Sequence, residues 1–321
     1  MGSAYSTWMD IETGVPQDSV LGPLLFNIFI NDFFFFIQES DVCNFADDNS
    51  LYATGKTTEE VCCKLEKDMK TAMTWFRNNS LEANPKTFQL MFLGTKKIIH
   101  KCLNIDGKIC HSKTSVLLLG IIIDWKLNFN EHVKQLCAKA NAKVKALYRL
   151  RSKLDPRQKL MLYNSFLMSN FNYCPMIWMF YGKTSNDMIN NTHKRALRAL
   201  YNDFNSNYHE LLKKGNHPNI HEMNKRRLLV EVYKCINKES PPILNGIFTS
   251  KENGINLRIN NKLVLPKVST QRGLHSFTYR GSRAWNTLSD DLKKSCSVKE
   301  FKSRLSDITA LDCTCKLCIR E

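Results

Sequence analysis

The sequence lacks an uninterrupted apolar run long enough to cross a membrane. The one candidate runs from Val20 to Ile37 and includes four consecutive phenylalanines, Phe33 to Phe36. Four residues interrupt it: Pro23, Asn27, Asn31 and Asp32. A membrane-spanning helix needs about 20 predominantly apolar residues, and polar side chains near its centre are costly. We therefore expect a buried helix in this segment and no membrane as a partner.

Features of a secreted, disulfide-rich protein are also missing. No signal peptide is recognisable, and the 12 cysteines are scattered over 321 residues instead of being concentrated in a short domain. We expect reduced thiols and a location in the cytoplasm or the nucleus. Cys313, Cys315 and Cys318 resemble part of a zinc knuckle, but a closed zinc site needs four ligands. An ordinary disordered tail is the simpler interpretation of that segment.

Negative charge is scarce in the second part of the chain. The formal net charge is +16, from 46 Lys and Arg against 30 Asp and Glu. Residues 1–130 contain 12 basic and 15 acidic residues, whereas residues 131–321 contain 34 and 15. A basic surplus of this size favours a polyanionic partner such as a nucleic acid. The distribution predicts a carboxylate-containing domain followed by a phosphate-binding domain.

The length allows two or three domains, and 43% hydrophobic residues are enough to form sizeable cores. Apolar periodicity predicts α-helices and β-strands in the same chain. Helices are expected over 21–31, 58–76, 131–151, 156–170, 186–201, 219–238 and 291–305. Strands are expected over 42–52 as a hairpin, 87–93, 103–110 as a hairpin, and 116–123 as one buried strand. Pro241-Pro242 is expected to be a linker.

Asp47 and Asp48 form the most informative local feature. They lie between two short apolar runs in the segment 42–52, which predicts a β-hairpin with both carboxylates at its tip. Adjacent carboxylates repel each other unless a divalent cation or a basic group compensates them. A solvated turn is the plainer interpretation of the spacing alone, because Asp and Asn favour turns. A metal site is the alternative.

Several motifs follow one another in an order that resembles the palm of reverse transcriptases. Gly-Val-Pro-Gln-Asp-Ser begins at Gly14, Ile-Asn-Asp at Ile30, and Phe-Ala-Asp-Asp at Phe45. Lys86-Thr87 before a strand, and Leu119-Gly120-Ile121 with Asp124, resemble later palm and primer-grip elements. His132 onward resembles the thumb, and the segment from Tyr279 to Asn286 resembles the C-terminal region. The closest group is the non-LTR retrotransposons of jockey-like type.

The resemblance implies specific roles. Asp47 and Asp48 would be the metal-binding pair of a polymerase active site that uses Mg²⁺, with two metal ions expected in the complete enzyme. Gln17, Phe45 and Ala46 would contact the substrate. Lys86 would lie near the triphosphate and assist the leaving pyrophosphate. Simpler roles are open to two of them: Lys86 as a solvated loop lysine, and Gln17 as a turn-capping amide.

Two departures from the family pattern stand out. The first motif usually has glycine where this chain has Asp18, so a position that needs φ > 0 or close backbone approach would be strained and negatively charged. The family's other catalytic aspartate belongs to a strand well upstream of Gly14, and only thirteen residues precede Gly14 here. Asp10 and Glu12 are too near the turn to match it. We therefore expect a C-terminal fragment without fingers or endonuclease domain.

These observations lead to two hypotheses. The first is an RNA-directed DNA polymerase with an RNA template, a DNA primer and dNTPs as partners, inactive as this chain alone. The second is a non-catalytic remnant that binds nucleic acid. The expected fold is α+β, with a partial antiparallel palm over 1–128, a basic helical thumb-like domain over 129–240, and a C-terminal region over 241–321 with a cysteine-bearing tail.

Overall fold

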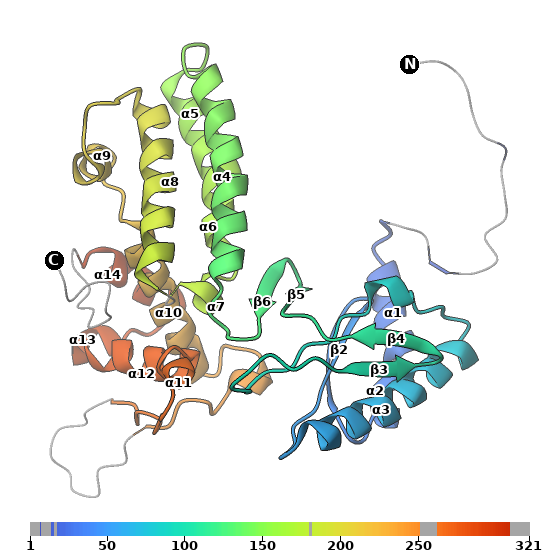
Figure 1. Ribbon diagram of the computed structural model, residues 1–321. Coiled ribbons are helices and arrows are strands. Elements are labelled where there is room, and N and C mark those ends of the chain that lie inside the picture. Colours follow the sequence, from blue (N-terminus) through green and yellow to red (C-terminus); the bar gives the residue numbers. More distant parts are fainter. Residues whose placement is uncertain (1–6, 8–13, 16–17, 180–181, 251–261, 309–321) are drawn as a thin grey trace, which may run out of the picture. The chain divides into compact units, whose positions relative to one another are not determined.

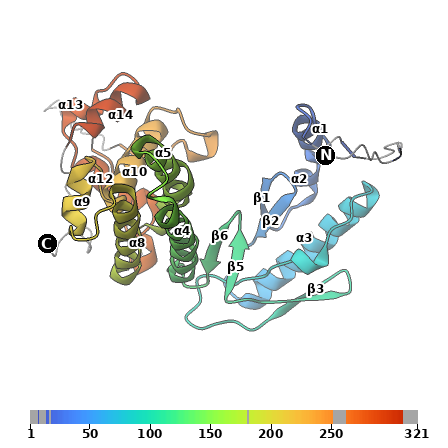
Figure 2. The same ribbon diagram turned by 90° about the horizontal axis from the view of Figure 1, so that it is seen from above.

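The chain forms two compact units, Met1–Val116 (unit 1) and Leu117–Glu321 (unit 2), drawn in two orientations in Figures 1 and 2. The computed structural model describes residues 7, 14–15, 18–179, 182–250 and 262–308. Unit 1 combines helices with two-stranded antiparallel sheets, and unit 2 is mainly helical. The expected α+β class is therefore confirmed.

The helices of unit 1 are α1 (Gly22–Ile30), α2 (Phe33–Phe36) and α3 (Thr58–Asn78). α3 begins where the sequence predicted, because the Thr57 hydroxyl accepts a hydrogen bond from the Glu60 backbone N–H at 3.2 Å, an N-cap that satisfies a helix-end donor. Phe33 of α2 is fully buried and stacks on Phe76 of α3, with ring centroids 5.2 Å apart. The two helices thus share one small core.

The α1 segment is a helix, but the prediction that it is buried was wrong. Its only buried residues are Gly22 and Ile30, and Leu24, Leu25 and Ile28 are 55%, 49% and 66% exposed. Apolar residues occupy nearly every face of this short helix, so one packing contact covers only a fraction of them. The whole Val20–Ile37 segment forms two short helices. Among the residues that the structure describes, no helix combines the length and apolar composition needed to cross a bilayer.

Two hairpins of unit 1 confirm the sequence patterns. β1 (Asp41–Phe45) pairs with β2 (Asp48–Tyr52), and β3 (Cys102–Ile105) pairs with β4 (Lys108–His111). The second hairpin turns at Asp106-Gly107, where both residues have positive φ, as a two-residue type I′ turn requires. Alternation along β3 buries its inward residues, Leu103 and Ile105, in a cluster with Leu65 of α3.

Two strand predictions were wrong. The segment 87–93 follows the 3₁₀ turn η1 (Pro85–Thr87) and forms only one isolated bridge, between Leu90 and Ser112. Its residues alternate only up to Leu90, and 90–93 are all apolar. Among the described residues no strand pairs with it along its length. The run 116–123 is not one strand either: β5 (Ser115–Leu118) and β6 (Ile121–Asp124) form a two-stranded sheet. Leu119-Gly120 between them has positive φ at both residues, which reverses the chain.

Unit 2 is built on a pair of long helices, α4 (Asn130–Leu150) and α8 (Lys183–Tyr201), which pack side by side, as Figure 1 shows. An apolar stripe of α4 is buried: Val133, Leu136, Ala140, Val144 and Leu147. Connecting and later elements are α5 (Pro156–Leu162), the π-helical segment η2 (Tyr163–Met168), α6 (Ser169–Asn172), α7 (Pro175–Trp178), α9 (Tyr208–Lys214) and α10 (Ile220–Ile236).

The C-terminal part of unit 2 packs short helices around α10. They are η3 (Pro242–Leu244), α11 (Gln271–Leu274), α12 (Phe277–Asn286), α13 (Asp290–Lys293) and α14 (Val298–Ser306). The single helix predicted over 291–305 was wrong, because the chain breaks between α13 and α14. The Ser295 hydroxyl donates to the Leu292 carbonyl at the end of α13, and the Ser297 hydroxyl accepts from the Glu300 N–H and so caps α14.

Candidate functional site

The predicted carboxylate pair lies at the tip of the β1–β2 hairpin. Phe45 pairs with Asp48, so Ala46 and Asp47 form the turn. Ala46 has φ +53°, a left-handed conformation that residues with a Cβ rarely adopt. The turn geometry therefore matches the prediction from sequence, and the positive φ at Ala46 is a strained feature that sequence reasoning missed.

Two asparagine side chains hold this turn in shape. Asn44 and Asn49 are cross-strand partners, and Asn44 Nδ2 donates to Asn49 Oδ1 at 2.9 Å and to the Ala46 carbonyl at 2.8 Å. Asn49 Nδ2 donates to the Asp47 carbonyl at 3.4 Å. These bonds satisfy turn carbonyls that no strand pairs, which fixes the backbone under the two carboxylates. The Asn residues on both sides of Phe-Ala-Asp-Asp were the available sequence signal.

The base of the hairpin is fixed to the core of unit 1. Val42 and Leu51 pack against the cluster that contains Ile30 and Phe33. Asp68 of α3 is buried, and its carboxylate accepts the backbone N–H groups of residues 38 and 39 at 3.3 and 3.0 Å. The chain is thus positioned just before β1 begins. Ile30 of α1 belongs to the same cluster, so the hairpin base packs near the end of that helix.

Asp47 and Asp48 are both exposed, and neither forms an ion pair within the described residues. Free, solvated carboxylates are suitable ligands for a hard divalent cation. They fit part of a metal site only, because the described part of the chain contains no group of three or more His, Cys, Asp or Glu that could hold a metal ion. When bound in a complete site, a divalent metal stabilises the oxygens that attack and leave in phosphoryl transfer.

The other predicted site residues are placed as follows. The Phe45 side chain is 65% exposed at the hairpin tip. Lys86 is exposed in the η1 turn, where Asn84 Oδ1 accepts its backbone N–H at 3.1 Å. Within the described residues, no hydrogen bond or ion pair joins Lys86 to the hairpin carboxylates. Gln17 lies outside the described residues, as do Cys313, Cys315 and Cys318.

Asp18 has the backbone conformation that makes glycine favourable at its position. Its φ is +60°, and Asp is one of the few residues with a Cβ that tolerates this region. The adjacent Ser19 hydroxyl accepts the Gly22 backbone N–H at 2.9 Å and so supports the start of α1. The conformational part of the expectation for Asp18 is confirmed, and the electrostatic effect of its charge stays a prediction.

Hydrogen bonds of Asp124 and Tyr173 order the chain where β6 leads into the long helices of unit 2. The Asp124 carboxylate accepts backbone N–H groups of the loop that leads into α4, with Oδ2 2.7 Å from the Phe129 nitrogen. Tyr173 donates its hydroxyl proton to the Leu119 carbonyl at 2.6 Å. Asp124 therefore orders the β6–α4 connection, and Tyr173 holds the β5–β6 turn that resembles a primer grip.

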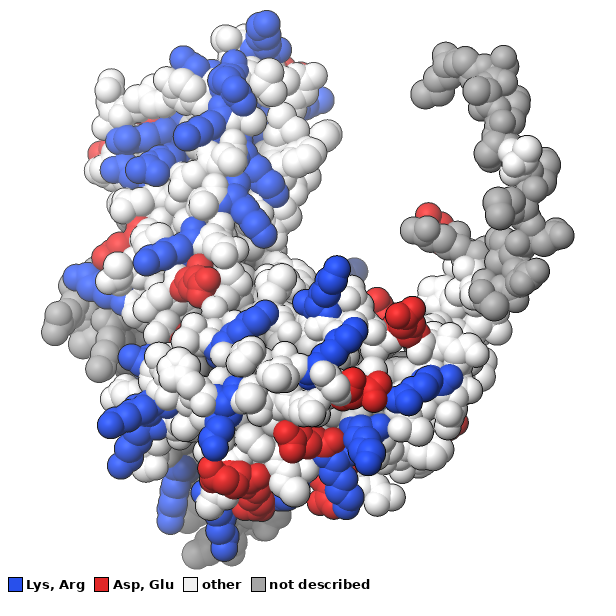
Figure 3. Space-filling model, turned by 45° about the vertical axis from the view of Figure 1, so that its right-hand side comes forward, with Lys and Arg blue, Asp and Glu red and all other residues white. Residues whose placement is uncertain are grey.

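The basic charge of unit 2 is concentrated on the elements from α4 to α8. Residues 130–201 contain 13 Lys and Arg and only three acidic residues, Glu131, Asp155 and Asp187. Within the described residues, none of these 13 cations forms an ion pair, whereas the ion pairs of unit 2 involve residues 203–304. Figure 3 shows Lys and Arg side chains gathered over the long helices of unit 2, with few acidic side chains among them. The surface is suited to phosphate groups.

We call the Lys and Arg side chains of residues 130–201 the basic surface. Its exposed members are Lys134, Lys139, Lys145, Arg149, Lys153, Arg157, Lys183 and Arg195. Arg195 Nη1 donates to Asn141 Oδ1 at 3.3 Å across the α4–α8 contact. Arg151 lies 3.9 Å from the ring centroid of Tyr148, a cation–π contact that orients it. Neutral partners position these cations and leave their charge uncompensated.

A buried polar cluster beneath this surface escaped sequence reasoning. His193 of α8 lies between two tyrosine hydroxyls, Tyr163 at 2.6 Å from Nε2 and Tyr208 at 2.8 Å from Nδ1. Burial lowers the pKa of His193 to about 3, and His217 nearby adds to this. The imidazole is therefore neutral at physiological pH and links η2, α8 and α9. Tyrosine and histidine scattered over 46 residues gave no sequence signal for it.

Part of the chain is similar to known proteins. The profile of the family described as "Reverse transcriptase (RNA-dependent DNA polymerase)" matches residues 3–123. The probable RNA-directed DNA polymerase from transposon BS of Drosophila melanogaster is 27% identical over 210 residues, 62% of this chain and 23% of that protein. The RNA-directed DNA polymerase from mobile element jockey of the same organism is 24% identical over 200 residues, 59% and 22% respectively.

A further relative comes from a wasp. The retrovirus-related Pol polyprotein from type-1 retrotransposable element R1 2 of Nasonia vitripennis is 28% identical over 178 residues, 51% of this chain and 43% of that protein. No solved structure matches the chain. The matched region spans less than a quarter of the two fly relatives. Residues 3–123 are thus similar to the reverse transcriptase family, and a larger part of the chain is similar to RNA-directed DNA polymerases of non-LTR transposons such as jockey and BS.

Proposed function

We propose that this chain is the palm and thumb part of an RNA-directed DNA polymerase, with RNA template, DNA primer and dNTPs as its substrates. The observation that carries the proposal is the exposed Phe-Ala-Asp-Asp hairpin inside the region that matches the reverse transcriptase family. Enzymes of this family use divalent metal ions, and the proposed ion here is Mg²⁺. We place its action inside the cell, in the cytoplasm or the nucleus.

The hairpin would contribute two metal ligands, Asp47 and Asp48. The adjacent Phe45 side chain is exposed and would contact the primer or the incoming nucleotide by apolar stacking. Ala46 would present its backbone at the turn, and Gln17 and Lys86 are proposed to contact the nucleotide. An ammonium at Lys86 would neutralise charge on the leaving pyrophosphate.

The basic surface of unit 2 would hold the primer–template. Its uncompensated cations can replace the counterions of several phosphates, which supports affinity without sequence preference. The proposed arrangement assigns catalysis to one unit and most of the binding energy to the other. The three-part division at residues 128 and 240 remains a proposal.

The 321-residue chain alone is proposed to bind nucleic acid without extending a primer. Support comes from the ligand count: the described residues contain no group of three metal ligands, and in-line displacement needs its metal ions held within fractions of an ångström, since a shift of about 1 Å costs on the order of a hundredfold in rate. The second candidate, a non-catalytic nucleic-acid-binding protein, rests on the basic surface of unit 2, which can bind phosphates without any chemistry in unit 1.

The test is primer extension on an RNA template with Mg²⁺ and dNTPs, measured beside binding of the same RNA–DNA hybrid. We expect binding without extension. Joining the chain to an upstream fingers segment with its aspartate, together with Asp18→Gly, should give extension, and Asp47→Asn should abolish it while leaving binding unchanged. Robust templated extension by the unmodified chain would contradict the proposed inactivity, and extension by the Asp47→Asn variant would contradict the site.

A further inference from the structure

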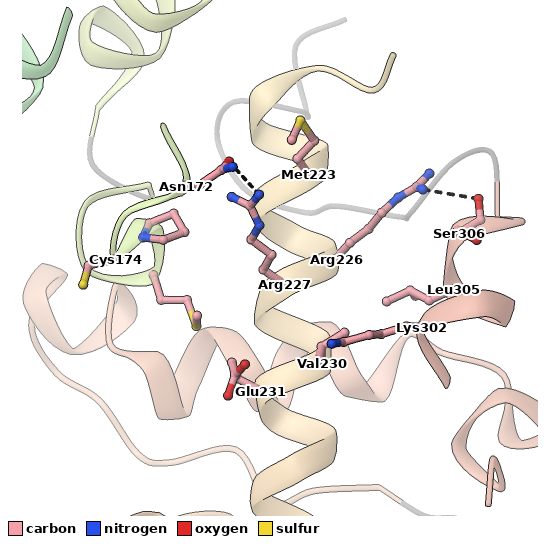
Figure 4. Close-up of a pocket in the computed structure, with 12 residues that line it drawn as sticks. Asn172, Cys174, Met223, Arg226, Arg227, Val230, Glu231, Lys302, Leu305 and Ser306 are labelled. Atoms are coloured by element: carbon pink, nitrogen blue, oxygen red, sulfur yellow. Dashed lines mark hydrogen bonds between the residues drawn. The ribbon is translucent and has the colours of Figure 1, made fainter. Parts of the chain in front are cut away.

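A pocket of about 580 Å³ lies in unit 2. Its walls come from α10, from α14 and from the segment that runs from the end of α6 to the start of α7. Figure 4 shows Arg226 and Arg227 extending from α10 to opposite sides, one toward Ser306 of α14 and one toward Asn172. The volume is in the range of pockets that bury a small molecule or a few side chains. None of the proposed polymerase residues lines it.

The inner wall is apolar and flexible. Met176, Met223, Val230 and Leu305 contribute aliphatic or thioether side chains. Methionine adapts its shape to irregular apolar groups, which suits a pocket that receives side chains of varied form. No aromatic ring is among the twelve described lining residues, so the pocket lacks the stacking surface on which proteins bind unpaired nucleobases.

Arg227 is a half-buried cation that forms no ion pair with a carboxylate within the described residues. Its Nη2 donates to Asn172 Oδ1 at 2.6 Å and its Nη1 to Asn224 Oδ1 at 3.3 Å. Burial lowers the pKa of Arg227, because its charge has lost solvent without gaining a counter-ion. The neighbouring Arg226 differs, since Glu222 lies 3.0 Å away and neutralises it. The two amides therefore orient Arg227 but leave its charge open to an anion.

Lys302 of α14 adds a second cation to the same pocket. Its side chain is exposed and, among the described residues, has no ion-pair partner. Among the described lining residues, Glu231 is the one carboxylate, and it is engaged with Lys234 at 2.7 Å. The pocket thus presents an apolar wall with Arg227 and Lys302 as two uncompensated positive charges.

We propose that this pocket docks an acidic segment of a partner protein. An apolar side chain of the segment enters between Met176, Met223 and Leu305, and a neighbouring carboxylate binds Arg227 and Lys302. Charge complementarity favours an acidic partner, and the aliphatic lining favours a peptide over a nucleic acid. This site is separate from polymerase chemistry and independent of the proposed function.

The exposed Cys174, which lines the pocket, allows a direct test on the full chain. A disulfide of N-(3-mercaptopropanoyl)phenylalanine and its matched carboxamide are equilibrated with the protein under mild reducing conditions, and labelled cysteines are mapped by mass spectrometry. One charge-assisted hydrogen bond gives roughly tenfold discrimination, so we expect the carboxylate to label Cys174 about tenfold more than the amide. Cys296, exposed in the same unit, should show no such preference.

Variants separate the charge effect from other causes. Lys302→Gln, at an exposed position that folding tolerates, should reduce the preference at Cys174 several-fold, Arg227→Gln should reduce it further, and Lys302→Arg should retain it. Equal labelling by acid and amide, or the same preference in Lys302→Gln, would overturn the proposal. Block of Cys174 labelling by an RNA oligonucleotide, but not by an acidic peptide such as Glu-Leu-Phe-Glu-Asp, would assign the pocket to nucleic acid and overturn it as well.

Discussion

Charge in unit 1 is nearly balanced, with 11 basic and 14 acidic residues, whereas unit 2 has 35 and 16. The motif that resembles reverse transcriptases lies in a turn of unit 1, at Ala46-Asp47, whereas the 13 cations without an ion pair among the described residues 130–201 lie in unit 2. The contrast suggests that the chemistry depends on a few fixed backbone positions and that binding depends on a distributed surface. Substitutions should therefore act differently in the two units.

The hydrophobic cores of the two units also differ in size. Unit 1 has two small cores around α3 and leaves most of α1 exposed. Unit 2 buries whole faces of α4, α8 and α10 in larger clusters. A rigid helical scaffold can carry many like charges because its core supplies the stability that their mutual repulsion reduces.

The largest effect should follow neutralisation of the basic surface. Replacing Lys134, Lys139, Lys145 and Arg149 of α4 by Gln should weaken binding of an RNA–DNA hybrid by orders of magnitude at low salt. The slope of log affinity against log salt should fall by up to about 3.6, since each phosphate contact contributes about 0.9. Fluorescence anisotropy over a salt series measures both quantities.

The matched control is a quadruple Gln variant of unit 1 at Lys70, Lys96, Lys97 and Lys108. These lysines are also exposed and form no ion pair within the described residues. The control should keep the affinity and salt slope of the unmodified protein. Equal losses in both variants would mean that binding follows total charge and not the basic surface.

Leucine-to-alanine substitutions should lower the free energy of unfolding much more in the core of unit 2 than on α1 of unit 1. Leu197 of α8 is fully buried, and Leu197→Ala should lower the free energy of unfolding by about 2–5 kcal/mol through lost burial and a cavity. Leu25→Ala on exposed α1 should change it by less than about 0.5 kcal/mol. Urea denaturation measures both. A large loss in Leu25→Ala would show that the apolar face of α1 is covered.

Acid should destabilise unit 2 through His193. Its folded pKa of about 3 lies below the unfolded value near 6.5, so the unfolded state alone binds a proton as the pH falls between these values. Stability should be unaffected above pH 7 and decrease by up to about 1.4 kcal/mol per pH unit below about 6.5. Denaturation between pH 7 and 4.5 measures this slope.

His193→Asn should lower stability at pH 7, because it disrupts bonds to Tyr163 and Tyr208, but it should flatten the pH dependence. His209→Asn, at an exposed position of α9, should keep the original slope. An unchanged slope in the His193 variant would assign the acid sensitivity to other groups.

The smallest expected effect is that of an alanine-to-glycine substitution on stability, and its sign should differ between the units. Ala46 has φ +53°, so Ala46→Gly should stabilise the hairpin by roughly 1 kcal/mol. The same substitution at exposed Ala138 in α4 should destabilise by about 1 kcal/mol, because glycine is a poor helix former. Thermal denaturation distinguishes them, and a loss in both would argue against the left-handed turn at Ala46.

Much of the fold followed from local patterns in the sequence. The β1–β2 hairpin, the start of α3 at Thr57 and the stripe of α4 depend on interactions between residues near in sequence, which a pattern records directly. The two strand errors have a different cause. The segment 87–93 would form a strand only with a partner strand, and among the described residues none lies beside it. The chain reversal at Leu119-Gly120 could not be recognised because apolar residues surround it.

The site was predictable where a motif fixed it and not where tertiary contacts build it. The turn position of Asp47 was evident from its neighbours, but the positioning of β1 by Asp68 and the His193 cluster join residues distant in sequence. Burial of α1 was overestimated because apolar composition reports a tendency to be covered, and does not identify the surface that covers it.

The most direct test of the division between the units is a cross-linking map on the full chain. An RNA template carrying 4-thiouridine, annealed to a DNA primer, is irradiated with the protein at low and high salt, and the cross-linked peptides are identified by mass spectrometry. The proposed division between the units predicts that most cross-links fall within residues 130–201 and disappear at high salt. Cross-links confined to unit 1, or a pattern insensitive to salt, would contradict it.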